Sequence, residues 1–129
     1  MIIDGTALLR IVLENPFLGR KYPQEGEALA VLDTGYEGFL AVPASIYRTL
    51  GLNELSQIHG EIILPSEEVI PTRLTYCVVE VVEAGTRLDG LVETFEELDE
   101  IVAGQELLSN LRVTLDYCRG YICVESCEP

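Results

Sequence analysis

Short apolar runs separated by glycine, proline and polar residues follow one another along most of the chain. Runs of this length between turn residues indicate β-strands. The predicted strands cover residues 7–14, 27–33, 38–42, 60–64, 69–83, 112–117 and 121–125. Two short helices are expected, one over residues 44–50 between Pro43 and Gly51, and one over residues 105–110. Short strands with two brief helices predict an all-β fold that forms a closed or nearly closed barrel.

The segments between these elements carry residues that favour turns. Residues 17–26 form a predicted loop, residues 65–68 a hairpin tip, and Asp89-Gly90 and Arg119-Gly120 two further turns. No internal repeat or low-complexity linker divides the chain. Its 129 residues are enough for one hydrophobic core, so we expect a single domain over residues 1–129.

Acidic residues outnumber basic ones, 22 to 8, which gives a formal net charge of −14. Such a charge repels nucleic acid and anionic membranes, and it favours neutral or basic peptide segments as partners. A solvated acidic surface with no meaning for partners is the simpler interpretation. No apolar run has the length of a membrane span, and the N-terminus lacks the basic region and cleavage site of a signal peptide. We therefore expect a cytoplasmic protein.

The segment with the clearest chemical content is Asp33-Thr34-Gly35, which follows the apolar strand that ends at Leu32. A carboxylate at the end of a buried strand is costly unless it is hydrogen-bonded or used. The hydroxyl of Thr34 can anchor the turn, and Gly35 lets backbone N–H groups approach the carboxylate. Asp-Thr-Gly also suits an ordinary turn, so the tripeptide alone does not decide its role.

Two further segments make the chain resemble the prokaryotic branch of the retropepsin-like aspartic peptidases. The first is Tyr36 with Gly38-Phe39-Leu40 and a proline that opens a helix; the second is residues 101–108 followed by residues 113–117. They stand in the order of the family's two signatures, and the resemblance spans residues 8–125. It implies the acid protease fold as a single lobe, with Asp33 as the catalytic residue.

Chain length adds a condition to this interpretation. Metal-free peptide hydrolysis needs one group to take a proton from water and another to protonate the amide, and two carboxyl groups sharing a proton supply both. The sequence contains one Asp-Thr-Gly, because Asp4-Gly5-Thr6 has the wrong order and Asp89-Gly90-Leu91 lacks the hydroxyl. We therefore predict a homodimer in which Asp33 faces its copy across a two-fold axis. The expected substrate is a peptide or protein, without a cofactor.

The resemblance assigns further roles by motif position. Thr34 would hydrogen-bond across the axis, Gly35 would offer backbone contacts to substrate, and Gly104 would pack behind the active loop. Residues 58–74 correspond to the family's flap, a hairpin that closes over an extended peptide, although an ordinary surface hairpin is an equal alternative. The predicted substrate-contacting residues are Tyr36 in the loop and Leu64, Pro65 and Ser66 near the flap tip.

Some positions depart from the family pattern. The flap is not glycine-rich, and Gln105-Glu106 stands where retroviral forms carry Arg-Asn or Arg-Asp. That change removes an ion pair between subunits, so the dimer is expected to be weaker or arranged differently. The second functional hypothesis is accordingly a non-catalytic relative that uses the same fold for dimerisation or peptide binding.

The remaining reactive residues have simpler explanations. The four cysteines, at positions 77, 118, 123 and 127, have spacings that suit zinc poorly, so free and largely buried thiols are expected, with a Cys118–Cys123 disulfide or a metal as alternatives. His59 is interpreted as an ordinary strand-end residue. The run from Glu93 to Glu100 concentrates five carboxylates, which predicts a solvated acidic loop.

Overall fold

A computed structural model describes residues 1–127 and contains eleven strands, two α-helices and one 3-10 helix. The strands are β1 (Ile2–Ile3), β2 (Thr6–Asn15), β3 (Arg20–Tyr22), β4 (Ala28–Leu32), β5 (Leu40–Ala41), β6 (Ile58–Ile63), β7 (Val69–Val81), β8 (Thr86–Thr94), β9 (Ile101–Ala103), β10 (Leu111–Asp116) and β11 (Tyr121–Ser126). The helices are α1 (Ala44–Thr49), η1 (Leu52–Glu54) and α2 (Gln105–Leu108). The expectation of a mostly β chain with two short α-helices is confirmed.

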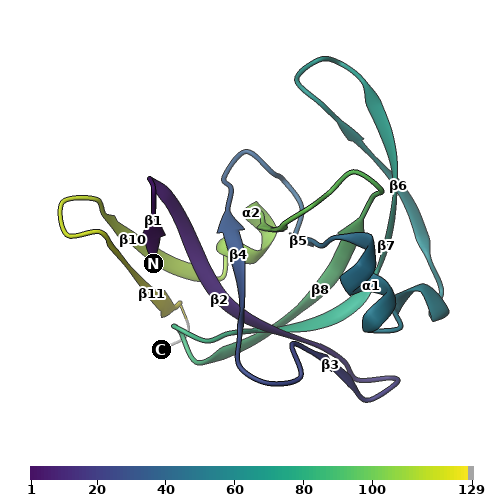
Figure 1. Ribbon diagram of the computed structural model, residues 1–129, viewed down its shortest axis with the longest axis horizontal. Coiled ribbons are helices and arrows are strands. Elements are labelled where there is room, and N and C mark those ends of the chain that lie inside the picture. Colours follow the sequence, from purple (N-terminus) through teal and green to yellow (C-terminus); the bar gives the residue numbers. More distant parts are fainter. Residues whose placement is uncertain (128–129) are drawn as a thin grey trace.

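Nine strands form one sheet in the order β1-β2-β4-β9-β5-β8-β7-β6, with β3 added beside β2. A further pairing between β2 and β7 joins the sheet to itself, so that β2, β4, β9, β5, β8 and β7 form a ring. Strands β10 and β11 make a separate two-stranded sheet that projects to the left in Figure 1. Among the described residues, no helix is long and apolar enough to span a membrane.

The core lies inside this ring because apolar residues alternate along its strands. In β2 the inward side chains Leu9, Ile11 and Leu13 are fully buried, while the residues between them are partly exposed. Helix α1 covers one side of the core with Tyr47, and two residues after its end comes Gly51, whose φ of 72° is the left-handed conformation that glycine adopts readily.

Strand β7 changes its buried face along its length. Its first half buries Ile70 and Thr72, whereas its second half buries Thr75, Cys77 and other odd-numbered residues. Because side chains alternate across a strand, this shift of one residue means that opposite faces are covered in the two halves. The second half of β7 therefore packs on the core, and the first half rises out of the ring with β6.

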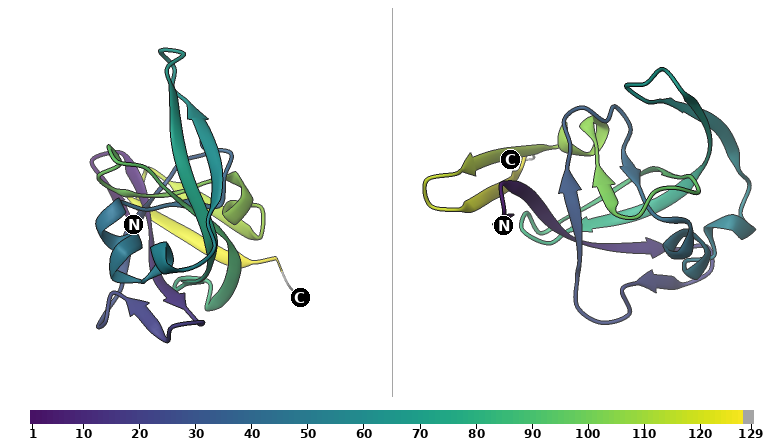
Figure 2. Two further views of the ribbon diagram at one scale, coloured as in Figure 1. Left: turned by 90° about the vertical axis from the view of Figure 1, so that its right-hand side faces the viewer. Right: turned by 45° about the horizontal axis from the view of Figure 1, so that its top comes forward.

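This projecting hairpin pairs Ile58 with Leu74 and Ile63 with Val69. Figures 1 and 2 show it standing above the rest of the sheet, on the same side as the loop that follows β4. Its tip comprises residues 64–68, where the Leu64 N–H donates to the Glu68 carbonyl (2.9 Å). Residues 58–74, the predicted flap, thus form a continuous hairpin, here called the flap hairpin.

Two predictions about turns and loops are wrong. Asp89-Gly90 lies inside β8, where Gly90 pairs with Cys77. The glycine is explained by packing, because a Cβ at this position would lie 2.8 Å from the ring of Phe39. The predicted loop over residues 17–26 contains the short strand β3, which pairs with the end of β2.

Candidate functional site

The loop after β4 begins with Asp33, whose backbone N–H donates to the carbonyl of Ala103 (2.9 Å). One carboxylate oxygen, Oδ1, accepts the N–H of Gly35 at 2.8 Å. A Cβ at Gly35 would lie 3.2 Å from that oxygen, so the absence of a side chain permits this close turn. Among the described residues nothing else hydrogen-bonds to the Asp33 side chain, which is exposed. The loop therefore presents a carboxylate at the surface, held by its own backbone.

Helix α2 fixes the loop from behind. The first amides of a helix have no partner within it, and here those of residues 104–106 donate to loop carbonyls with N···O distances from 2.8 to 3.1 Å. The acceptors are the carbonyls of Tyr36, Gly38 and Phe39. The Gln105 side chain adds a contact, from Nε2 to the Thr34 carbonyl (2.5 Å). The loop thus rests on backbone hydrogen bonds from an element about 70 residues away.

Gly104 lies where the helix and the loop come into closest contact. A Cβ at this position would overlap the carbonyl oxygen of Gly38 and would lie 2.6 Å from Cδ2 of Tyr36. Real Cβ atoms are not found this close to other atoms. Only glycine fits here without displacing the backbone of the loop.

The side chain of Tyr36 reaches from the loop to the end of β8. Its hydroxyl donates to Oε1 of Glu93 at 2.6 Å. Burial and the adjacent Glu93 carboxylate raise the pKa of the Tyr36 hydroxyl well above its usual value. The hydroxyl therefore stays protonated and remains a hydrogen-bond donor to Glu93.

Glu93, the penultimate residue of β8, is only 6% exposed. Its second oxygen, Oε2, accepts the hydroxyl of Thr72 at 2.6 Å. The prediction of a solvated acidic loop from Glu93 to Glu100 is therefore wrong for its first residue, because β8 extends to Thr94 and carries Glu93 beneath the flap hairpin. One carboxylate links the loop, through Tyr36, to the flap hairpin, through Thr72.

A pocket of about 470 Å³ lies between the loop and the flap hairpin. Its walls come from the loop, from β6 and from the end of β8; the lining residues are Gly35, Tyr36, Glu37, Gly38, Glu61, Ile62, Ile63 and Glu93. Of the sequence-predicted site residues, Gly35 and Tyr36 line it. Leu64, Pro65 and Ser66 lie at the tip of the hairpin and are not among the described residues that line this pocket. The structure thus brings the last three residues of β6, rather than the tip, next to the loop.

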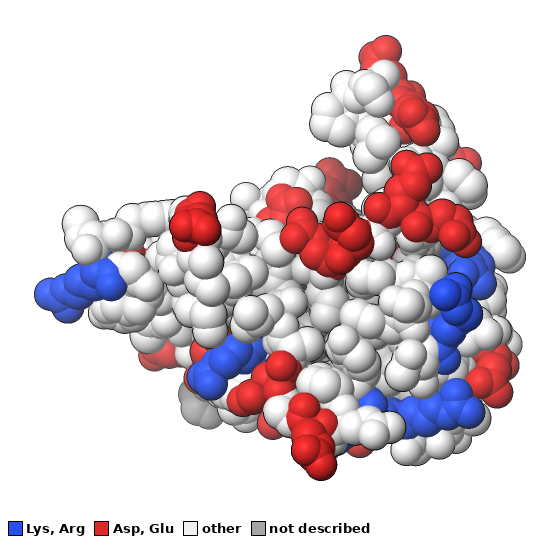
Figure 3. All heavy atoms as spheres, viewed as in Figure 1, with Lys and Arg blue, Asp and Glu red and all other residues white. Residues whose placement is uncertain are grey.

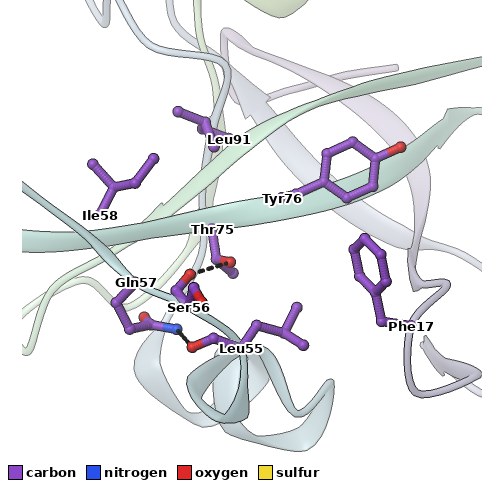
Figure 4. A pocket seen from close by; sticks show the side chains of 8 residues that line it. All are labelled: Phe17, Leu55, Ser56, Gln57, Ile58, Thr75, Tyr76 and Leu91. Carbon is purple, nitrogen blue, oxygen red and sulfur yellow. Dashed lines mark hydrogen bonds between the residues drawn. The ribbon is translucent and has the colours of Figure 1, made fainter.

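A second pocket, of about 410 Å³, lies at the base of the flap hairpin and contains no residue of the Asp33 loop (Figure 4). It is lined mainly by apolar side chains, among them Phe17, Leu55 and Tyr76. Phe17 packs edge-on against Tyr76, with 5.6 Å between ring centroids. Figure 4 shows the Thr75 hydroxyl donating to the Ser56 carbonyl and the Gln57 side-chain amide donating to the Leu55 carbonyl. This pocket offers an apolar surface without groups suited to catalysis.

The cysteines are free among the described residues, but only Cys77 is buried; Cys118, Cys123 and Cys127 are exposed. The expectation of largely buried thiols is therefore wrong for three of the four, because the β10–β11 hairpin that carries two of them projects away from the core. No group of three or more His, Cys, Asp and Glu residues suited to a metal occurs within residues 1–127.

Sequence reasoning missed Glu93, Thr72 and the role of Gln105. Glu93 stands at the start of an acidic run, and nothing in the run distinguishes a buried glutamate from exposed ones. In the sequence, Gln105 stands out only as a departure from the pattern of retroviral forms. Its position directly after a glycine that packs on the loop is the signal that could have identified it as a residue that supports the loop.

Comparisons with known proteins give a sequence relative and a structural neighbour. No family model matches the chain. An uncharacterized protein of Archaeoglobus fulgidus is 44% identical over 127 residues, an alignment that covers 98% of this chain and 99% of that protein. The crystal structure of a retropepsin-like aspartic protease from Rickettsia conorii superimposes with a TM-score of 0.53 and 16% identity, over 96% of this chain and 99% of that one. At this identity the structural likeness establishes the fold alone.

Proposed function

The chain belongs to the same family as the uncharacterized Archaeoglobus fulgidus protein and has a retropepsin-like fold, and from this premise we propose that it is an aspartic endopeptidase that acts as a homodimer. One observation carries the proposal. Asp33 directly follows strand β4, its loop is held by the amides of residues 104–106, and its carboxylate is nevertheless exposed. Within one chain the carboxylate accepts only the N–H of Gly35 among the described residues, so its other oxygen is left exposed and fits a site that a second copy completes.

In the proposed mechanism the two Asp33 side chains hold one water molecule between them. One carboxylate takes a proton from the water, whose oxygen attacks the carbonyl carbon of the peptide bond. The other, protonated, carboxyl group donates to the carbonyl oxygen. A proton then passes to the amide nitrogen as the C–N bond breaks. The two carboxyl groups titrate as one unit, so the roles of base and acid are not fixed to either chain.

The flap hairpin and Thr34 have supporting roles in this proposal. Strand β6 is the last strand of the sheet order, so its outer backbone groups are available to an extended peptide that adds as a further strand. The hydroxyl of Thr34 has no hydrogen-bond partner among the described residues of one chain. It is therefore free to donate across the axis of a dimer.

Cleavage of an unfolded protein from acidic to neutral pH tests the proposal. Asp33→Asn keeps the shape of the side chain and removes the base, so we expect the rate to fall by about a thousandfold or more. Asp99→Asn, an exposed change in another loop, is the matched control and should leave the rate intact. Cleavage that persists in Asp33→Asn, or that is absent from the wild type at every pH, contradicts the proposal.

The second candidate is a peptide-binding or dimerisation module without catalysis. It is favoured by the flap tip, which contains no glycine between Leu64 and Glu68, and by Gln105-Glu106 in place of the Arg-Asn or Arg-Asp pair of retroviral forms. Sedimentation analysis distinguishes the candidates together with the cleavage assay. A dimer that binds peptides without cutting them supports the module.

A further inference from the structure

The pocket between the loop and the flap hairpin has an unusual charge. Three of the residues that line it are glutamates, Glu37, Glu61 and Glu93, and among its described lining residues there is no lysine, arginine or histidine. Glu37 and Glu61 are exposed, so water screens their charge, but Glu93 is 6% exposed. The electrostatic character of the interior of the pocket is therefore set by Glu93.

Glu93 is a buried carboxylate without a basic partner. Buried carboxylates in proteins are usually paired with a cation, because removing the charge from water is costly. The described residues form five ion pairs with lysine or arginine, and none of these pairs includes Glu93. Its partners are the neutral hydroxyls of Tyr36 and Thr72. The position thus lacks the counter-charge that a carboxylate in such surroundings normally has.

The two hydroxyls leave room for a ligand at the carboxylate. Each carboxylate oxygen has two lone pairs, and each accepts one hydroxyl here. Gly60 of β6 lies beside the group, since a Cβ there would be 3.8 Å from Oε2. Leu74 and Thr72 fill the space next to Gly60, so a ligand reaches Glu93 from the pocket that this residue lines, where a charged donor could add to the two hydroxyls already present.

The walls of the pocket suit a long, flexible cation. Ile62 and Ile63 at the end of β6 supply apolar surface, and the opposite wall includes Tyr36, whose ring fills the side-chain space beside Gly38. The methylene stem of a lysine or arginine packs on such surface while its charged end stays with polar groups. Gly35, two residues from Asp33, is one of the residues that line the pocket.

We propose that this pocket binds the lysine or arginine side chain of a peptide substrate, and that Glu93 is the residue that selects it. The inference rests on the proposed endopeptidase function, because the pocket adjoins the loop that carries Asp33. It assigns to the protein a substrate class, polypeptides with a basic residue close to the cleaved bond. Tyr36 and Thr72 act as positioning residues, because each holds one oxygen of Glu93 in place.

Cleavage-site mapping by mass spectrometry on an unfolded protein is the first arm of the test. We expect the mapped sites to have lysine or arginine at one fixed position near the cleaved bond. In matched peptides, cleavage with lysine or arginine at that position should be about tenfold faster than with norleucine. Glu93→Gln removes the charge but keeps polar groups for both neighbours, an amide oxygen for Tyr36 and an amide NH₂ for Thr72. The ratio of the cleavage rates of the basic and the norleucine peptide should therefore fall to near one. Glu97→Gln, an exposed change that removes the same charge elsewhere, should retain the wild-type ratio.

Binding is the second arm and does not require catalysis. Fluorescently labelled peptides that differ only in a central lysine or norleucine are titrated into Asp33→Asn and into Asp33→Asn with Glu93→Gln. Tighter binding of the lysine peptide, lost in the double variant, supports the pocket. Equal binding of both peptides, preference that survives Glu93→Gln, or no binding of either peptide overturns it.

The two arms separate this inference from the proposed function. Cleavage without a basic preference overturns the role of the pocket and leaves the peptidase intact. Lysine-dependent binding without cleavage supports the pocket and counts against the peptidase. The ratio measured on the wild type is decisive even if Glu93→Gln does not fold, because a wild type without preference contradicts the proposal directly.

Discussion

At the scale of single residues, Gly104 shows how one position joins two distant segments. Its backbone N–H donates to Phe39 at 3.0 Å, and its missing side chain admits the carbonyl of Gly38 and the ring of Tyr36. An added methyl group has no space and would displace backbone rather than a flexible side chain. The geometry of the Asp33 loop therefore depends on this glycine.

Gly104→Ala should lower the free energy of unfolding by about 3 kcal/mol, because the Cβ must displace the backbone of the loop. Urea unfolding measures the change. Gly85→Ala is the control: no atom lies within 4 Å of a Cβ there, and only its φ of +59° resists the substitution. Its cost should be about 1 kcal/mol. Equal costs at the two positions would argue against close packing at Gly104.

Cys77 differs from the other three cysteines in its surroundings. It is fully buried, and burial raises the pKa of its thiol from 9.0 to about 12. The unfolded thiol loses its proton near pH 9 while the folded one keeps it, so this contribution to stability is present below pH 9 and is lost as the pH rises toward 12. Cys77→Val should make the decline of unfolding free energy above pH 9 less steep, and Cys118→Ser should leave it unchanged. An identical slope in Cys77→Val would contradict this account.

At the scale of elements, local sequence predicted the flap hairpin well and the elements around Glu93 poorly. Pro65-Ser66 between two apolar runs marks a hairpin tip from its own residues, and strands β6 and β7 pair from Ile58 to Leu74 as expected. Asp89-Gly90 has the same local signature as a turn, yet lies within β8, because the ring of Phe39 occupies the space beside Gly90. Whether Asp89-Gly90 forms a turn or a strand is decided by contacts with segments distant in sequence, and a local sequence pattern does not contain that information.

In the candidate site, the Asp33 loop is recognisable from local sequence, whereas the burial of Glu93 is not. The loop of Asp33 was identified because its residues are contiguous. The buried state of Glu93 depends on Tyr36 and on Thr72, which come from a loop and from β7. A carboxylate whose surroundings are assembled from three separate segments cannot be recognised from its neighbours in the sequence.

Thr72→Val should loosen the flap hairpin. It removes a hydrogen bond to a buried carboxylate and should cost about 2 kcal/mol, with faster amide hydrogen exchange in β6 and the first half of β7. Thr94→Val is a close control, because Thr94 is 1% exposed and its hydroxyl is without a hydrogen-bond partner. That change should be neutral or stabilising. Equal amide exchange rates in the wild type and Thr72→Val would show that the Thr72 hydroxyl does not stabilise the flap hairpin.

At the scale of the whole molecule, the charge is large and unevenly distributed. In the view of Figure 3, acidic side chains gather over the flap hairpin and the upper surface beside it, whereas basic ones lie lower and on the projecting hairpin at the left. The net charge of −14 means that two copies repel each other at long range. Association must overcome this repulsion, which salt screens.

The proposed dimer should therefore tighten as salt is added. Between dilute buffer and about 0.5 M salt, where the screening length is only a few ångströms, we expect the dissociation constant to fall by about tenfold. Sedimentation equilibrium measures it, with glycerol at equal osmolality as the control. A dissociation constant that rises with salt would indicate that attractive ion pairs between subunits dominate.

The exposed position of Asp33 has a consequence for control of the proposed enzyme. Since the loop is already braced by residues 104–106 in the single chain, pairing requires no refolding of the acidic turn. Below the dissociation constant the population of paired chains varies with the square of their abundance. The rate of proteolysis would then rise more steeply than the concentration of the polypeptide. At low expression most copies would be single chains, held inactive by dilution alone.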